Sequence, residues 1–307
     1  MSVASEIERI KGNIASAYTA ASGKGATMPD VQNSANLAGC IDTITGGGGS
    51  ASKYGVTIDN ILGDASETLG GYTRPTEPFT VNMTGVKIIS SHLTFRFANL
   101  PVERLLFPDA IRIGSTSSGI GATGGACAYL CYAASTSLAE LAEISFPNLE
   151  EVAGYGFAYA FYNQSMKSAV FPKLITAGNY SFNNAFYGTQ LESAEFPALE
   201  TIGTSAFANG FYNSKYLAYV SFPSLVSLGQ LAFNYCFYKC ALTAISFPML
   251  TTVATNSFGS STSSLAFSGC SGLTEIHFRA DMQATIEAMT GYSSKFGATS
   301  STIYFDL

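Results

Sequence analysis

Cysteine and histidine are the side chains of this sequence that could hold a metal ion. Four of the six cysteines form two pairs, Cys127/Cys131 and Cys236/Cys240, without the Cys-x-x-Cys spacing usual in zinc sites. Of the two histidines, His277 falls at an outward strand position, where we expect an exposed residue without nearby groups to complete a site. We therefore expect the cysteines to be small buried apolar residues, and we expect no metal or other cofactor.

Carboxylates are the other side chains that could do chemistry. Glu143 and Glu195 occur in copies of one repeat that are two copies apart, or about 10 Å, and such a pair could cleave glycans. Glu150 and Glu151 have the pattern of solvated surface charges. The sequence has no Gly-x-Ser-x-Gly elbow, no glycine loop with lysine for phosphate, and no His-Glu-x-x-His motif. It therefore predicts a protein that is not an enzyme, with glycan cleavage as an alternative.

A repeat of about 25 residues positions these side chains. Phe-Pro begins at 107, 146, 171, 196, 222 and 247, and the steps from 146 onward are 25, 25, 26 and 25 residues. The pattern L-x-x-I-x-F around each phenylalanine alternates apolar and polar residues at its end, as in a strand with one buried face. The proline that follows cannot donate to a strand ladder, so each strand is predicted to end there.

The second half of each copy carries the pattern Phe-x-x-x-Phe-Tyr. A spacing of four places both phenylalanines on one side of a short helical turn. Cys127 and Cys131 occupy these two positions in an earlier copy. The sequence therefore predicts an α/β repeat fold, a leucine-rich-repeat solenoid with one strand and one short helix per repeat and the Phe-Pro phenylalanines stacked inside.

The middle of the Phe-x-x-x-Phe element offers candidate binding residues. Tyrosine and asparagine give rigid, amphipathic contact area and adaptable hydrogen bonds. A solvated helix face is the alternative interpretation. The candidate receptor-binding residues are Tyr129, Tyr159, Asn184, Asn209 and Tyr235.

The composition excludes several classes of partner. Charged residues make up only 12% of the chain and the net charge is −6, which argues against nucleic acid. No apolar run is long enough to span a bilayer, so we expect no membrane insertion. The first residues lack the apolar block of a signal peptide, and we therefore expect synthesis in the cytoplasm.

The first 45 residues differ from the rest. Val3, Ile7, Ile10 and Ile14 form a short heptad seam, and isoleucine at both seam positions favours trimers. A helical hairpin with a second helix around Ile41 is the alternative. The predicted organisation is a helical attachment and oligomerisation module (1–45), a Gly/Ser linker (46–52), a connecting module (53–80), the repeats (81–279) and a C-terminal cap of helix plus strand (280–307).

Two segments of the chain resemble known protein families, and these resemblances imply a function. Residues 81–278 resemble BspA-like leucine-rich repeats, which occur in bacterial surface proteins and adhesins. The opening segment "SEIERIKGNIASAY…KGATMPD…LAGCIDTI" is similar to the N-terminal part of tail-fibre and tail-tip proteins from phages and prophages of gut Firmicutes. Together they imply a receptor-binding protein on a virion tail that recognises a glycan or protein of the bacterial surface and contacts other tail or baseplate proteins through its N-terminus. A host-encoded adhesin or scaffold at the cell surface is the alternative.

Overall fold

The computed structural model describes residues 78–89, 93, 97–114, 125–134 and 140–307. These residues belong to one compact unit, Val56–Leu307. The predictions made for the first 77 residues, including the trimer seam of Val3, Ile7, Ile10 and Ile14, lie outside the described residues.

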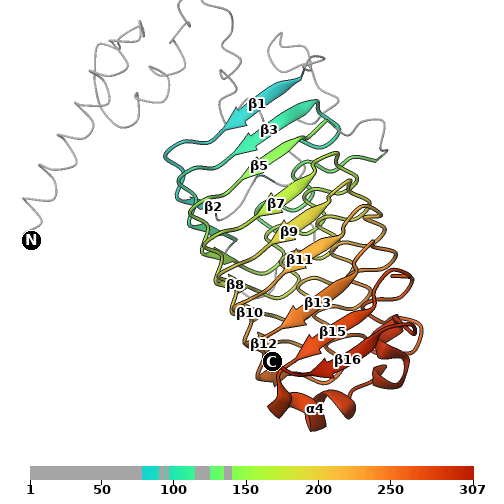
Figure 1. Cartoon of the computed structure of the whole chain (residues 1–307). Coiled ribbons are helices and arrows are strands. Elements are labelled where there is room, and N and C mark those ends of the chain that lie inside the picture. Colours follow the sequence, from blue (N-terminus) through green and yellow to red (C-terminus); the bar gives the residue numbers. More distant parts are fainter. Residues whose placement is uncertain (1–77, 90–92, 94–96, 115–124, 135–139) are drawn as a thin grey trace, which may run out of the picture. The chain divides into compact units, whose positions relative to one another are not determined.

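One side of the solenoid is built from the predicted strands (Figure 1). They pair in parallel in three successive sheets, ordered β1-β3-β5, β7-β9-β11 and β13-β15-β16. Each repeat strand has an inward side chain between outward ones, as the alternation of L-x-x-I-x-F requires. The strands are β1 (Phe79–Asn82), β3 (Val102–Leu106), β5 (Glu143–Ser145), β7 (Ser168–Val170), β9 (Ser193–Glu195), β11 (Tyr219–Ser221), β13 (Ala244–Phe247), β15 (Glu275–Phe278) and β16 (Thr302–Phe305).

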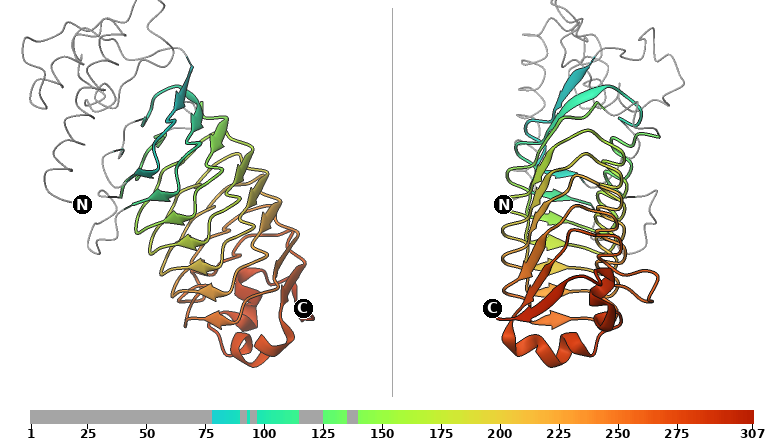
Figure 2. Two further views of the ribbon diagram at one scale, coloured as in Figure 1. Left: turned by 90° about the vertical axis from the view of Figure 1, so that its left-hand side faces the viewer. Right: turned by 45° about the vertical axis from the view of Figure 1, so that its right-hand side comes forward.

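A second parallel ladder, which the sequence did not predict, runs along another side (Figure 2). Its strands are β2 (Ile88–Ile89), β4 (Arg112–Ile113), β6 (Glu151–Val152), β8 (Thr176–Ala177), β10 (Thr201–Ile202), β12 (Ser227–Leu228) and β14 (Thr252–Val253). Successive repeats approach closely just after these strands. A Cβ atom on Gly229 would lie 2.6 Å from the carbonyl carbon of Gly203, so Gly229 leaves no room for a side chain while these repeats stack this closely.

The predicted short helix is wrong. The Phe-x-x-x-Phe elements are non-helical turn segments, which we define as residues 126–133, 155–163, 180–188, 205–213 and 231–239. Their backbone N–H groups alternate between two partners. Phe157 donates to the carbonyl of Ser181 in the next repeat at 2.8 Å, whereas Ala158 donates back to Tyr155 at 3.1 Å.

The backbone angles explain why no helix forms there. In the segment from 155, Tyr155, Tyr159 and Asn163 have φ of 56°, 57° and 57°, so every fourth residue is left-handed. This pattern makes every second N–H group point along the solenoid axis. These N–H groups donate to carbonyl groups of the next repeat, as in a parallel sheet. The fold is thus a solenoid of parallel strands and turns. The predicted repeat and its strand are confirmed, but a turn segment stands where the α/β prediction had a helix.

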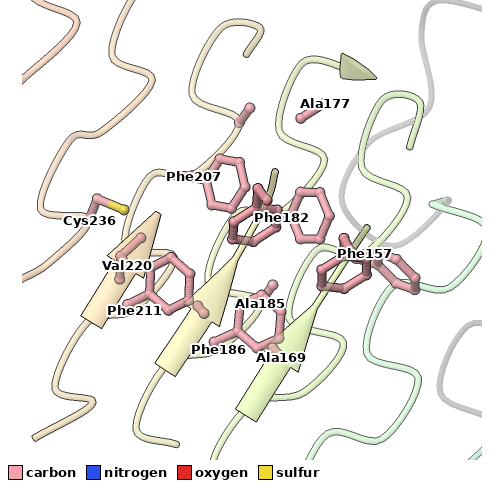
Figure 3. Close-up of a cluster of buried hydrophobic side chains, with 14 of the residues drawn as sticks. Phe157, Ala169, Ala177, Phe182, Ala185, Phe186, Phe207, Phe211, Val220 and Cys236 are labelled. Carbon is pink, nitrogen blue, oxygen red and sulfur yellow. The ribbon is translucent and has the colours of Figure 1, made fainter. Parts of the chain in front are cut away.

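Stacked phenylalanines fill the interior, as predicted. Those of the Phe-Pro motifs are all buried. The centroid of the Phe171 ring lies 5.9 Å from that of Phe146 and 5.4 Å from that of Phe196. Phenylalanines of the turn segments, among them Phe157, Phe182 and Phe207, follow one another through the same core (Figure 3). The ring of Phe182 meets that of Phe196 edge-on, with centroids 6.0 Å apart. Each repeat therefore shares its core mainly with its two neighbours.

Helices occur, among the described residues, only at the C-terminal end (Figures 1 and 2). They are η3 (Ala280–Met282), α4 (Gln283–Glu287) and η4 (Tyr292–Gly297). Met282 and Ile286 are buried in the same core as the stacked phenylalanines. Strand β16 then pairs with β15, and the ring of Phe305 lies 6.1 Å from that of Phe278.

Candidate functional site

The five candidate binding residues occupy one equivalent position of the turn segments, and all are left-handed. Their φ angles lie between 50° and 57°, for Tyr129, Tyr159, Asn184, Asn209 and Tyr235. Asparagine tolerates this conformation better than other residues with a side chain, because its short amide can bond locally. The backbone alone therefore accounts for Asn184 and Asn209, and binding is not needed to explain them.

The candidates differ in how much surface they present. Asn184 is only 8% exposed, and its Nδ2 donates to Oδ1 of Asn183 at 2.7 Å. Tyr129, Tyr159, Asn209 and Tyr235 are half-buried. The rings of Tyr129 and Tyr159 stack with centroids 4.6 Å apart and an angle of 2° between their planes. The tyrosines thus form contact surface, whereas Asn184 offers almost none.

A longer row of tyrosines lies beside the candidates, and sequence reasoning missed it as a site. Tyr132, Tyr162, Tyr187, Tyr212 and Tyr238 are half-buried and stack in order along the solenoid axis. The centroid distances between successive rings are 4.9, 4.5, 4.8 and 4.3 Å. The signal that could have found the row is the tyrosine that follows the second phenylalanine in each copy.

The two rows of tyrosines touch each other. The ring of Tyr129 meets Tyr132 edge-on at 5.5 Å, and Tyr235 lies 6.1 Å from Tyr212 and 5.8 Å from Tyr238. We call the whole surface the tyrosine face. It consists of Tyr129, Tyr132, Tyr159, Tyr162, Tyr187, Tyr212, Tyr235 and Tyr238.

Small residues end the longer row. The N–H group of Asn99 donates to the carbonyl of Tyr132, and that of Lys239 donates to the carbonyl of Ser268, in the same pattern that joins the other turn segments. This pairing aligns Ala98 with Tyr132 and Ser268 with Tyr238. The row therefore spans five repeats within the described part of the chain.

The tyrosine face is almost uncharged. Lys239 is the single charged residue in the turn segments as defined above, and its Nζ lies 5.0 Å from the centroid of the Tyr238 ring. Burial, with smaller contributions from neighbouring phenols, raises the pKa of Tyr162 to about 12. Burial also raises the pKa values of Tyr129, Tyr159 and Tyr212. The hydroxyls therefore stay protonated at neutral pH and can both donate and accept hydrogen bonds.

The cysteines are core residues, as predicted. Cys127, Cys131, Cys236, Cys240 and Cys270 are free and buried, whereas Cys40 lies outside the described residues. Burial raises the pKa of the Cys270 thiol to about 12, and this thiol donates to the carbonyl of Phe237 at 2.8 Å. Within the described ranges, no three His, Cys, Asp or Glu residues are grouped as metal ligands.

The glutamates that could form an acid–base pair are placed differently on their strands. Glu143 is the first residue of β5, and Arg104 donates to both of its carboxylate oxygens, at 2.7 and 3.2 Å. The hydrogen bond from Arg104 lowers the pKa of Glu143, whereas a general acid needs a raised one. Glu195 is the last residue of β9, in register with Val170 and Ser221.

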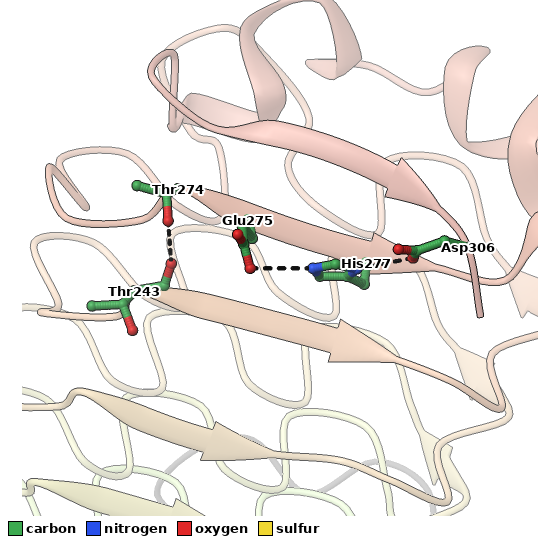
Figure 4. A network of polar contacts seen from close by, with 5 residues as sticks. All are labelled: Thr243, Thr274, Glu275, His277 and Asp306. Atoms are coloured by element: carbon green, nitrogen blue, oxygen red, sulfur yellow. Dashed lines mark hydrogen bonds and ion pairs between the residues drawn. The ribbon is translucent and has the colours of Figure 1, made fainter.

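His277 has more partners than its sequence position indicated. It is half-buried, with its Nδ1 2.9 Å from Oδ1 of Asp306 and its Nε2 3.5 Å from Oε2 of Glu275 (Figure 4). Its ring stacks on Tyr304 of β16, with centroids 4.7 Å apart. Since Tyr304 and Asp306 belong to the last segment of the chain, these contacts hold that segment against β15.

Comparison with known proteins identifies the repeats. Residues 157–234 and 183–294 match a family model described as a BspA type leucine rich repeat region, with six copies. Two solved structures match the chain. One is a leucine-rich repeat protein from Eubacterium ventriosum, with 14% identity over 58% of this chain and 67% of that chain and a TM-score of 0.23. No curated protein matches. Among the described residues, no helix has the length and apolar character that crossing a membrane requires.

Proposed function

We propose that this protein recognises a receptor on a bacterial surface through its tyrosine face, without catalysis; residues 157–294 match the family model of a BspA type leucine rich repeat region, which supports this proposal. The observation that carries the proposal is the tyrosine face itself. Eight of the ten half-buried tyrosines on the turn segments form this face, and the segments hold one charged residue, Lys239.

Tyrosine suits recognition for physical reasons. Its ring gives a large contact area with little loss of conformational entropy, and its hydroxyl adds a hydrogen bond. In this protein the stacking further restrains the rings, as between Tyr187 and Tyr212, which are 4.8 Å apart with an angle of 5° between their planes. A restrained surface loses less entropy on binding than a mobile one.

We further propose that the protein is carried on a phage tail. The support is the resemblance of the opening segment to the N-terminal part of phage tail-fibre proteins. In this proposal residues 1–45 attach the chain to the tail and the repeats contact the host. In this arrangement the N-terminal module contacts other tail proteins, as a trimer. Antibodies against the repeat region should label the tail tips of virions, and tail and lysis genes should flank the coding sequence. Labelling of host cell envelopes in place of virions would instead favour a host-encoded adhesin.

Adsorption to bacterial cells tests the receptor-binding role. The full-length protein is incubated with cells, and the bound fraction is compared with that of Tyr162→Ala/Tyr212→Ala. We expect the double variant to lose most of its binding. The matched control is Tyr216→Ala/Tyr219→Ala, because both of these tyrosines are exposed outside the tyrosine face. Unfolding curves establish that both variants are folded. Equal adsorption by the folded double variant and the wild type would show that another surface binds.

A further inference from the structure

We propose that the ligand of the tyrosine face is a linear, uncharged polysaccharide that lies along the solenoid axis, with one sugar residue over each repeat. This inference deepens the proposed function and rests on it for the choice of surface. Four properties of the face support it: the period of the tyrosine row, the orientation of its rings, its charge and its length.

The period of the row matches an extended sugar chain. Successive rings from Tyr132 to Tyr238 are 4.3 to 4.9 Å apart, which is the spacing that parallel strands impose on stacked repeats. One sugar residue in an extended β-linked polysaccharide has a comparable length. A chain lying along the axis would therefore meet an equivalent tyrosine at each sugar, and the contacts would stay in register across the row.

The orientation of the rings favours a ligand rich in hydroxyls. The flat faces of the inner rings, such as Tyr187 between Tyr162 and Tyr212, are already covered by their neighbours. Each inner ring therefore offers its edge and its hydroxyl. Besides burial, neighbouring phenols contribute to the raised pKa values of Tyr162 and Tyr212, so these hydroxyls lie near those of Tyr187 and Tyr238. Each hydroxyl can exchange hydrogen bonds with a sugar hydroxyl, which also donates and accepts.

The distribution of charge excludes a strongly ionic ligand. The turn segments contain Lys239 as their single charged residue, and its ammonium already lies over the ring of Tyr238. Ion pairs occur instead on the strand side, as between Arg104 and Glu143 at 2.7 Å and between Lys167 and Glu192 at 3.3 Å. A polyanion would find one cation along the row and a polycation no carboxylate, so the matching polymer is neutral.

The length of the row sets the length of ligand that it can bind. Tyr132 and Tyr238 end it, because the aligned positions beyond them are Ala98 and Ser268. Five tyrosines therefore accommodate five consecutive sugars. Affinity should rise with each sugar up to about that number and then level off, since further sugars meet no tyrosine.

Calorimetric titration with oligosaccharides of defined length tests this ligand class. The probes are cello-oligosaccharides and N-acetylated chito-oligosaccharides of two to eight sugars, which are neutral, with oligogalacturonides of the same lengths as charged counterparts. We expect binding of the neutral series that strengthens up to about five sugars and is insensitive to salt. Failure of both neutral series to bind, affinity that does not depend on length, or equal binding of the galacturonides would each overturn the inference.

Two substitutions of the central tyrosine separate the ring from its hydroxyl. Tyr187→Ala should weaken binding of the five-sugar probe about tenfold, because it removes a central anchor and interrupts the row. Tyr187→Phe keeps the stacking and the fold, and we expect it to lose several-fold through the hydroxyl alone. Tyr219→Ala, on β11 and outside the tyrosine face, should bind as the wild type does. Unchanged binding by both Tyr187 variants would place the sugar elsewhere.

The two proposals can fail separately. Suppose that adsorption to cells depends on Tyr162 and Tyr212 but that no neutral oligosaccharide binds. The receptor-binding proposal would then stand, and the polysaccharide ligand would be overturned. The same conclusion would follow if protease treatment of the cells abolished adsorption and periodate oxidation of their sugars left it unchanged. Oligosaccharide binding without adsorption to cells would instead leave the sugar site and overturn the receptor role.

Discussion

The ring of Phe196 lies parallel to that of Phe171, with centroids 5.4 Å apart and an angle of 4° between their planes. Phe222 stacks on its other side at 5.2 Å, so Phe196 joins three consecutive repeats. We expect Phe196→Ala to lower the free energy of unfolding by about 3–5 kcal/mol, as truncation of a buried aromatic residue does. Denaturant unfolding measures the change. Ser193→Ala, at an outward position of the same strand, is the control, and an equal loss for both variants would contradict the stacking argument.

Close stacking of the repeats makes a second prediction. A Cβ atom on Gly229 would lie 2.6 Å from the carbonyl carbon of Gly203 and 2.7 Å from the amide nitrogen of Thr204. Because both are backbone atoms, Gly229→Ala must push two repeats apart, at a cost of about 1–3 kcal/mol. On Gly154 the nearest neighbour of the same atom would be the carbonyl oxygen of Asn179, at 3.5 Å. We therefore expect Gly154→Ala to be tolerated in thermal unfolding, and a reversed order of the two variants would refute the explanation.

The left-handed turn position can be tested at Asn209, where φ is 53°. Asn209→Gly should leave stability nearly unchanged, because glycine adopts this conformation without strain. Asn209→Ala should cost roughly 1 kcal/mol, the penalty of a Cβ atom in the left-handed region. Chemical denaturation of the two variants provides the comparison. If both lose the same stability, the amide side chain is what the position requires, and the backbone argument fails.

Alkaline pH should destabilise the fold through its tyrosines. Burial raises the pKa of Tyr162 from 10.0 to about 12, so above pH 10.0 the unfolded chain releases this proton while the folded chain keeps it. The unfolded state then binds fewer protons, and the free energy of unfolding falls as the pH rises from 10.0 through about 12. Below pH 10.0 this contribution is complete. Tyr162→Phe has no proton to lose and should show a shallower decline over this range.

The buried thiols should resist alkylation. The thiolate is the reactive form, and burial raises the pKa of Cys270 from 9.0 to about 12. In a Cys40→Ser background, iodoacetamide at pH 8 should leave Cys127, Cys131, Cys236, Cys240 and Cys270 unmodified in the folded protein and label all five in denaturant. Peptide mass spectrometry reads out the labelling. Rapid modification of any of these residues without denaturant would show that it is accessible in the folded state.

Part of the fold could be predicted because the sequence repeats it. The strands that precede Phe-Pro, the stacked phenylalanines and the buried cysteines follow from alternation, from the prolines and from a constant spacing. The second ladder did not follow, because a two-residue strand such as Thr201–Ile202 is too short to show alternation.

The prediction of a short helix in each repeat was wrong for a related reason. A spacing of four between Phe157 and Phe161 fits a helix, but it equally fits turns in which every fourth residue is left-handed. Tyr155 and Tyr159 gave no sign of that conformation, because tyrosine rarely adopts it. Asn184 and Asn209 did carry the sign, since asparagine favours left-handed turns, but the pattern was interpreted as binding.

The binding residues predicted from the sequence lie on the turn segments that carry the tyrosine face, but the longer row of tyrosines was not identified. Tyr162 and Tyr187 follow the second phenylalanine at a fixed position, so both could be read from the sequence as surface residues. Their 4.5 Å stacking depends on how successive repeats lie over one another, and that comes from the inter-repeat hydrogen bonds, such as the one from Asn163 to Tyr187 at 2.7 Å.

The alignment of successive turn segments also bears on how such a protein can evolve. Successive turn segments repeat the same backbone pairing, as between Tyr159 and Asn183 or between Asn184 and Ala208, and this pairing keeps the phenylalanines and tyrosines of neighbouring repeats aligned. Duplication or loss of one whole repeat would leave all the columns in register and would lengthen or shorten the tyrosine row by one ring. A single unequal recombination could thus change the length of the tyrosine row, and of the ligand proposed for it, in steps of one unit, without the need to rebuild the core.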